Sequence, residues 1–394
     1  MRKTITIGDL GTIITGKTPP TTNKNYYGDY AVFIKPTDIS EQCKFTYETE
    51  EMYSKLAAEK YESSLIPKGA ICVPCIGTIG TKMTMAPCDC YTNQSINSIV
   101  CNEYYDNEYI YYLIKNFLPG LKAYNLGTAS GREYVSKSNF EKIELVAEQD
   151  KTIQKKIGEF LSRYDSLIEN YQKQIKLLEE AAQRLYKEWF VDLHFPGHEN
   201  TKIVDGVPEG WEKKKLIELV DVQYGYAFDG KLFNNNGEGM PILRIRNIPD
   251  GKTSDYTSEE ASEDYIVHNG DIVIGMDGIF HINSWSGGDA YLVQRACSFR
   301  PMKEELKGFI FQAIQVPIKY FEKTLVGATV AHLGKKHIDS IDLLYPNNEK
   351  LFVPLQKIFD KRQLALSQIR LLSEARDRLL PKLMSGKIQI LNKR

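Results

Sequence analysis

Amide and guanidinium side chains gather near the ends of several strand-like stretches of this 394-residue chain. Arginine, asparagine and glutamine are the residue types that reach guanine and adenine edges in the major groove of DNA. The residues of this kind are Asn93, Gln94, Arg244, Arg246, Asn247, Gln294 and Arg295. Taken singly, each is more often an ordinary solvated side chain, but they recur at matching places in the two halves. We therefore predict two base-reading surfaces, and replacing Arg244 or Arg246 by alanine should relax recognition at one of them by about 1–3 kcal/mol.

Basic residues close to these positions suit contacts to phosphate groups, which fix the register on a duplex without reading its sequence. They are Lys17, Lys35, Arg132, Lys137, Lys335 and Lys336. The net charge of the chain is only −1, and its pI is about 6.6. A protein that acts through nonspecific phosphate attraction should be more basic. A nucleic-acid role must therefore rest on local clusters, or on partners that supply positive charge.

The sequence lacks the arrangements that usually carry catalysis. It contains no Gly-x-x-x-x-Gly-Lys-Ser/Thr phosphate loop and no His-Glu-x-x-His zinc helix. Its six histidines are scattered, and none pairs with a plausible nucleophile. We do not expect an active site carried by this chain alone. An enzyme would need a carboxylate or metal cluster that the sequence does not display.

The four cysteines Cys72, Cys75, Cys88 and Cys90 have a spacing that could form a zinc site. The counterpart of the Cys72 strand in the second half, Asp271–Ile274, contains no cysteine. This comparison favours Cys72 as a small apolar strand residue. Zinc stays open as the alternative, and metal analysis of the purified protein would settle it.

Two long helices must hold these surfaces in place. Apolar residues alternate at three- and four-residue steps, first from Leu161 to Trp189 and again, in the same phase, from Leu355 to Leu383. The predicted seam residues are Leu161, Tyr164, Ile168, Tyr171, Ile175, Leu178, Leu185, Leu355, Ile358, Ile369, Leu372, Leu379 and Leu383. The spacing predicts two helices, each about 45 Å long at about 1.5 Å per residue, packed on one another. The alternative is a pair of unrelated amphipathic helices.

The segments that precede the two helices also match. Val32–Ile39 corresponds to Pro241–Ile248, and Leu126–Arg132 corresponds to Val326–His332. The unit is too long for a solenoid repeat. The predicted fold class is α+β: two similar globular domains separated by two long helices packed as an antiparallel coiled coil, an internal duplication.

The predicted domain boundaries follow from this repeat. Residues 1–150 form the first globular domain and 151–195 the first long helix. Residues 196–210 form a linker, 211–350 the second globular domain, and 351–394 the second long helix with a C-terminal tail. A stiff helix pair would keep the domains near one turn of DNA apart, about 34 Å. The target should then have two parts with unread bases between them.

No stretch of the sequence predicts export or membrane insertion. The first residues lead directly into the strand-like Ile5–Ile7 without a signal-peptide pattern. No apolar run approaches the roughly 18 residues of a membrane span. We expect a cytoplasmic protein.

The chain resembles the specificity subunit of type I restriction-modification enzymes over essentially its whole length. The most specific matches are Gly16–Pro19, Phe33–Ile39, the loops at Gly127 and Gly327, Leu185–Asp192 and Leu379–Gly386. The second half departs from the first where Tyr224–Phe228 replaces the Gly16–Pro19 motif. The resemblance extends the expected DNA contacts to further residues of these motifs and loops: Thr18, Thr37, Asp38, Ser130, Thr329 and His332.

The resemblance also implies a set of partners. A specificity subunit has two target-recognition domains and no activity alone, and it chooses the DNA sequence for two methyltransferase subunits. Motor-nuclease subunits can join to form the restriction enzyme. The partners would bring S-adenosylmethionine, ATP and magnesium chemistry and would flip the target adenine for methylation. The alternatives are a non-catalytic helical scaffold and the specificity subunit of a methylation-only system.

Overall fold

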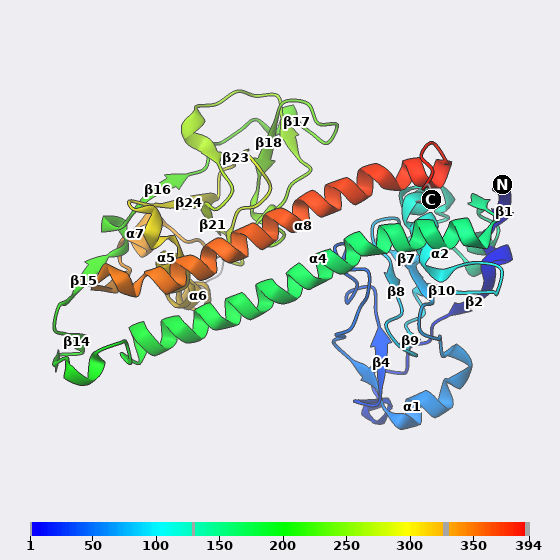
Figure 1. The fold of residues 1–394 in the computed structure, drawn as a ribbon, viewed down its shortest axis with the longest axis horizontal. Coiled ribbons are helices and arrows are strands. Elements are labelled where there is room, and N and C mark those ends of the chain that lie inside the picture. Colours follow the sequence, from blue (N-terminus) through cyan, green and yellow to red (C-terminus); the bar gives the residue numbers. More distant parts are fainter. Residues whose placement is uncertain (1, 128–130, 326–330, 391–394) are drawn as a thin grey trace. The chain divides into compact units, whose positions relative to one another are not determined.

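The computed structural model describes residues 2–127, 131–325 and 331–390 and divides into two compact units. Unit 1 contains Met1–Glu169 and Leu372–Arg394, and unit 2 contains Asn170–Leu371. Two long helices, α4 (Lys151–Tyr186) and α8 (Val353–Ser385), each contribute to both units (Figure 1). The units therefore differ from the domains predicted from sequence. Antiparallel pairing packs the start of one helix against the end of the other, so each globular domain gains parts of both helices.

The globular domain of unit 1 is built from short strands and three helices. Its strands are β1 (Arg2–Thr6), β2 (Gly11–Thr15), β3 (Tyr27–Gly28), β4 (Ala31–Ile34), β5 (Met52–Tyr53), β6 (Ile71–Pro74), β7 (Ile76–Gly77), β8 (Thr84–Met85), β9 (Tyr91–Thr92), β10 (Ile96–Cys101), β11 (Glu133–Tyr134) and β12 (Glu144–Glu148). Its helices are α1 (Lys55–Lys60), α2 (Asn107–Phe117) and α3 (Lys137–Glu141). The strand orders are β2-β10-β6-β8 and β3-β5-β4-β9, and two further pairs are β1-β12 and β7-β11.

The globular domain of unit 2 follows the same plan. Its strands are β15 (Trp211–Lys215), β16 (Val220–Tyr224), β17 (Phe233–Asn234), β18 (Met240–Leu243), β19 (Tyr256–Thr257), β20 (Ile266–Val267), β21 (Ile272–Gly275), β22 (Ile282–Ser284), β23 (Ala290–Leu292), β24 (Ala296–Pro301) and β25 (Asp342–Pro346). Its helices are α5 (Lys307–Ala313), α6 (Gln315–Thr324) and α7 (Lys335–Asp339). The order β16-β24-β21-β22 repeats that of the first sheet in unit 1, and β15-β25 repeats β1-β12. The α+β class and the internal duplication are confirmed.

The predicted linker contains structure of its own. A two-stranded hairpin joins β13 (Ile203–Val204) to β14 (Val207–Pro208), directly before β15. The turn between the strands is Asp205-Gly206, and both residues have a positive φ. Asp-Gly is the pairing that two-residue hairpin turns favour.

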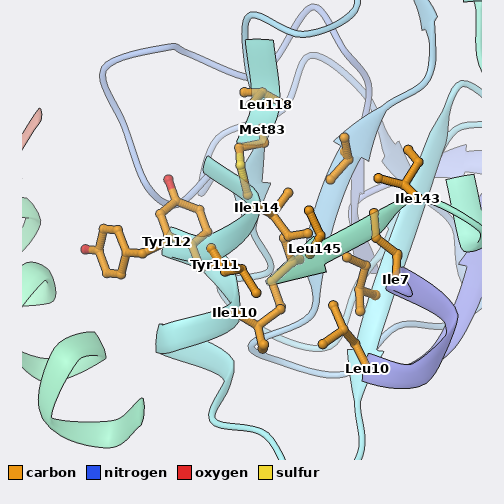
Figure 2. Packing of buried hydrophobic residues seen from close by; sticks show 14 of the residues in the cluster. Ile7, Leu10, Met83, Ile110, Tyr111, Tyr112, Ile114, Leu118, Ile143 and Leu145 are labelled. Carbon is orange, nitrogen blue, oxygen red and sulfur yellow. The ribbon is translucent and has the colours of Figure 1, made fainter. Parts of the chain in front are cut away.

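The core of unit 1 joins the sheet to both long helices. Ile7 and Leu10 meet Ile110 and Ile114 of α2, with Leu145 of β12 beside them (Figure 2). The same cluster takes in residues of the long helices: Ile157 and Leu161 of α4 and Leu380, Leu383 and Met384 of α8. Each fully buried side chain of this size contributes about 1.5–3 kcal/mol. Folding of the domain and docking of the helices therefore share one apolar cluster.

The core of unit 2 is built in the same manner from the opposite ends of the helices. Ala182 of α4 and Leu355 and Phe359 of α8 belong to one cluster with Phe309 of α5. None of the predicted seam residues is exposed in the structure, and Leu161, Ile168, Leu355 and Leu383 are fully buried. The heptad pattern thus marks the face that each helix turns inward.

Two arginines that interrupt the apolar seam of α8 are buried in ion pairs with α4. In unit 1, Arg376 pairs with Asp165, whose other carboxylate oxygen accepts a hydrogen bond from the Tyr112 hydroxyl. In unit 2, Arg362 Nε lies 2.7 Å from Glu179 Oε1. Arg362 also donates to Asn283 Oδ1 at 2.9 Å. Each pair therefore joins α4 to α8 inside one unit, which requires the helices to run antiparallel.

Candidate nucleic-acid interface

In the first domain, backbone hydrogen bonds draw several loops together around the turn between β9 and β10. The bonds run from Lys17 N to Thr92 O (2.9 Å), from Asn93 N to Ile34 O (3.1 Å) and from Cys75 N to Ser95 O (2.7 Å). The candidate residues that this arrangement brings onto neighbouring loops are Lys17, Thr18, Lys35, Thr37, Asp38, Asn93 and Gln94. Lys17, Thr37 and Gln94 are exposed, so a partner could reach their side chains.

The second domain repeats the same backbone contacts. The bonds run from Tyr226 N to Leu292 O (2.9 Å), from Val293 N to Leu243 O (3.0 Å) and from Met276 N to Arg295 O (2.8 Å). They bring together Arg244, Arg246, Asn247, Gln294 and Arg295. Tyr226 thus takes the place of Lys17, and Arg295 takes the place of Ser95. The two domains therefore share the backbone hydrogen bonds of this frame but differ in the side chains that it carries.

A glycine is required at one position of this frame in both domains. A Cβ atom on Gly16 would lie 2.1 Å from the Thr92 carbonyl oxygen, and a Cβ atom on Gly225 would lie 2.2 Å from the Val293 carbonyl oxygen. Both distances are far below contact, and the obstacle is backbone that cannot swing aside. The second domain therefore keeps the backbone of the Gly16 loop although its other motif residues differ.

The backbone also corrects one pairing made from the sequence. Val135 N donates to Cys75 O, and Leu333 N donates to Met276 O, each at 2.8 Å. Because Val135 and Leu333 are equivalent, His332 corresponds to Tyr134 and not to Arg132. The preceding loops differ in length, so residues at equal distances from Leu126 and Val326 do not occupy equivalent positions in the two domains. Lys137 and Lys335 remain equivalent, because they begin α3 and α7.

The basic residue at the end of β4 or β18 is held by an acid of its own domain. Lys35 Nζ lies 2.6 Å from Glu50 Oε2. Arg244 and Arg246 both reach Asp255, at 2.8 and 2.7 Å. Burial alone would raise the pKa of Asp255, but hydrogen bonds from the two arginines outweigh it and lower that pKa below its usual value. These cations are therefore paired with carboxylates of their own domain. Any contact that they make to DNA must form beside, or in place of, these ion pairs.

Three further candidates cap turns of the same loops. Asp38 accepts the Lys35 backbone N–H at 2.7 Å, and Asn247 accepts the Arg244 backbone N–H at 2.9 Å. Asn93 accepts the Ser95 backbone N–H at 3.0 Å. These side chains shape the loops, whereas Gln94 and Gln294 are exposed beside them.

Asp277 is a residue of this surface that the sequence analysis did not select. Its carboxylate binds two predicted residues: Oδ2 lies 3.0 Å from Arg295 Nη1, and Oδ1 lies 2.6 Å from His332 Nδ1. Asp277 is the second residue after the buried strand β21, and a polar residue close behind a buried strand is the signal that pointed to Arg244. It could have identified Asp277 as well.

The remaining phosphate candidates lie on or near the short helices. Lys335 and Lys336 are exposed in the first turn of α7. Lys137 is exposed at the start of α3, 3.7 Å from Glu141. Arg132 is also exposed. Ser130 and Thr329 lie outside the described residues.

The cysteines are mostly strand and core residues. Cys72 is fully buried in β6, and burial raises the pKa of its thiol to about 12. Burial likewise raises the pKa of Cys75 to about 12, whereas Cys88 is exposed. A thiol with a raised pKa is a poor source of the thiolate that zinc binds. Within residues 2–127, 131–325 and 331–390, no group of three or more His, Cys, Asp or Glu side chains is arranged to hold a metal ion.

Comparison with known proteins identifies the family. The model of the type I restriction modification DNA specificity domain matches the chain twice, over residues 2–180 and 208–375. The chain belongs to this family. Each match contains one globular domain and most of the long helix that follows it. Each globular domain is therefore a target-recognition domain, and the function of the chain is recognition of a DNA target.

Curated relatives match either almost the full chain or a part of it. The MjaIX specificity subunit of Methanocaldococcus jannaschii is 26% identical and aligns with 98% of this chain and 93% of its own length. The HindI specificity subunit of Haemophilus influenzae is 37% identical over a shorter stretch, 38% of this chain and 33% of its own length. The crystal structure of a type I S subunit from M. genitalium has a TM-score of 0.57 at 16% identity, covering 100% of this chain and 97% of that one. That structure supports the fold.

The helices in the described part of the chain do not meet the requirements for a membrane span. None of these helices combines the necessary length with the necessary apolar character.

Proposed function

We propose that this chain directs a type I restriction-modification complex to a two-part, asymmetric DNA target, with each domain reading one part. The observation that carries the proposal is a loop frame present twice with different side chains. Arg295 stands where the first domain has Ser95, and His332 stands where it has Tyr134. A shared frame lets both domains meet a duplex in the same way, and different side chains give different base preferences.

Phosphate contacts would come from residues that recur. Lys137 and Lys335 begin equivalent helices in the two domains and are exposed. Contacts to phosphate fix position without reading bases, so equivalent lysines suit that role in both domains. The net charge of −1 leaves little nonspecific attraction, and binding should depend on such local groups.

The long helices are the proposed site for two methyltransferase subunits. On α4, Leu167 and Leu177 are 50% and 65% exposed, and on α8, Leu364 and Leu371 are 61% and 49% exposed. Leucines left open on helices that already bury an inner seam suit helical partners. In this proposal the chain carries no catalytic group. Its partners supply S-adenosylmethionine for adenine methylation, and motor-nuclease subunits supply ATP- and magnesium-dependent restriction.

Methylome sequencing tests the proposal directly. Cells that carry the gene, cells that lack it and cells complemented with it are compared by adenine methylation. We expect a two-part motif with unread bases in its centre, present in the first and third strains and absent from the second. Identical methylomes in all three strains, or a single uninterrupted motif, would contradict the proposal.

A further inference from the structure

One charged cluster stands on the loop frame of the second domain, and the equivalent described positions of the first domain carry no charged residue. It consists of Asp277, Arg295 and His332. The matching hydrogen bonds of the frame place Ile76, Ser95 and Tyr134 at the equivalent positions of the first domain. The backbone supports these equivalences, because Ile76 pairs with Tyr134 as Asp277 pairs with His332. The two domains therefore share the backbone at these three positions but differ in all three side chains.

Asp277 is placed to orient Arg295. The carboxylate is largely covered, with 18% of its side chain exposed, and each oxygen serves one partner. Arg295 is 69% exposed, and it contacts Asp277 through Nη1. A guanidinium group has five N–H donors in a rigid fork. Asp277 therefore fixes one arm of the fork, and donors remain for a partner outside the domain.

His332 holds the carboxylate from the other side. Its Nδ1 lies 2.6 Å from Asp277 Oδ1. An ionised carboxylate only accepts hydrogen bonds, so this ring nitrogen must carry the proton and donate. With both oxygens engaged, Asp277 has little freedom to rotate away from Arg295.

The backbone of Arg295 is held in a conformation that arginine rarely adopts. Its φ is +70°, in the left-handed region, in the turn between β23 and β24. Ser95, at the equivalent turn of the first domain, does not have a positive φ. Residues in that region cost free energy and often mark functional sites. Here the unusual φ coincides with the residue that the carboxylate orients.

We infer that Arg295 reads a guanine in the half-site of the second domain, and that Asp277 is its positioning residue. The inference rests on the proposed function. An arginine fork matches the O6 and N7 acceptors of guanine in the major groove. A long side chain loses less conformational entropy on binding when it is already held in place. The first domain has Ser95 and Ile76 at the equivalent positions, so its half-site lacks this guanine contact.

The experiment uses the full chain in complex with its methyltransferase partner and a selection from randomised double-stranded DNA. Arg295→Gly removes the side chain and suits the left-handed backbone, so the fold should survive. We expect the preference for guanine over the other bases to fall by about 5- to 100-fold at one position of one half-site, and the other half-site to be unchanged. Arg295→Lys should give an intermediate loss, because lysine cannot make the two parallel bonds.

Asp277→Asn tests the positioning role separately. The amide keeps the size of the carboxylate but loses its charge. We expect a weaker guanine preference at the same position, with a smaller loss than Arg295→Gly produces. The control is Lys303→Ala, which removes one cation and one ion pair, to Glu349, at the other end of β24. It should leave the selected motif unchanged.

The outcomes distinguish failure of the proposed function from failure of the roles assigned to Arg295 and Asp277. If the wild-type complex selects no two-part motif, the proposed function fails. If it selects one and Arg295→Gly selects the same motif, the cluster merely holds the loop and the inference is overturned. If Arg295→Gly relaxes a position that is not guanine, the base assignment is wrong. If Asp277→Asn matches wild type, Asp277 has no positioning role.

Discussion

The two target-recognition domains share a backbone and differ in the chemistry that it displays. Both need a glycine at the same point, Gly16 or Gly225, and both close their central turn with the same hydrogen bonds. On that frame the first domain carries Ser95 where the second carries Arg295. Positions with the same residue and the same contacts in both domains maintain the fold. Equivalent positions with different side chains are the candidates for sequence specificity.

The domains also differ in how they are secured to the long helices. In unit 1 both members of the ion pair, Asp165 and Arg376, have only 6% of their side chains exposed. In unit 2, Arg362 is 9% exposed, but Glu179 is 39% exposed. Water can screen the second pair and can replace it when it is broken. The first pair has no such compensation, so the two junctions should respond differently to mutation.

The largest expected effect is the loss of Arg376. Arg376→Ala leaves the buried Asp165 without its cation and should destabilise the protein by about 3–5 kcal/mol. Arg362→Ala should cost less, because its acid is partly solvated. Denaturant unfolding of both variants measures the difference. Arg378→Ala, an exposed arginine on the same helix, is the control and should change stability by less than about 0.5 kcal/mol. Equal losses at Arg376 and Arg362 would remove this contrast between the junctions.

Asp255 provides the next test, because it secures the β18 loop of the second domain. Asp255→Asn removes the charge that Arg244 and Arg246 share and should cost about 1.5–3 kcal/mol at neutral pH. The folded-state pKa of Asp255 is lowered from 3.8. Its stabilisation is therefore complete above the unfolded pKa and is lost as the pH falls through the lower folded value. As the pH falls from 7 to below 3.8 and Asp255 becomes protonated, the stabilities of wild type and variant measured by unfolding should approach one another. A difference that persists at low pH would show that shape, and not charge, is responsible.

The shared glycine tests the frame itself. Gly16→Ala and Gly225→Ala each force a Cβ against a carbonyl oxygen and should each cost about 1–3 kcal/mol. The two losses should be similar, because the two environments match. Gly230→Ala is the control, since a Cβ there meets nothing within 4 Å. A loss at only one of the two glycines in thermal or denaturant unfolding would mean that the frames are not equivalent.

The smallest effect is expected from the recurring lysines. Lys335→Ala or Lys137→Ala removes one phosphate contact, which should lower the slope of log affinity against log salt by about 0.9. The selected sequence should not change, because phosphate contacts carry no base information. Titration of the assembled complex with its target at several salt concentrations measures the slope. A changed motif in either variant would assign that lysine to base recognition.

Much of the architecture could be predicted from the sequence, because it rests on repeated local patterns. The alternating apolar steps from Leu161 to Trp189 mark a buried helix face, and the recurrence of Gly-containing loops marks a duplicated domain. Partners that lie far apart in the chain leave no such pattern. Asp277 meets Arg295 and His332 through three separate segments, and the sequence gives no reason to join them. In the same way, the sequence shows that Arg362 and Arg376 interrupt the apolar seam of α8, but it does not show which acidic residues of α4 pair with them.

Exchange of the domains shows most directly whether one shared frame carries two independent sets of reading side chains. Residues 2–148 and 211–346 are bounded by equivalent strand pairs, β1-β12 and β15-β25. A chain with the second domain in both places should direct its methyltransferase to a symmetric target, in which the half-site of that domain occurs twice in inverted orientation. Methylome sequencing of cells that carry this chain reads the motif. An unchanged asymmetric motif would contradict the account of one shared frame with two sets of reading side chains.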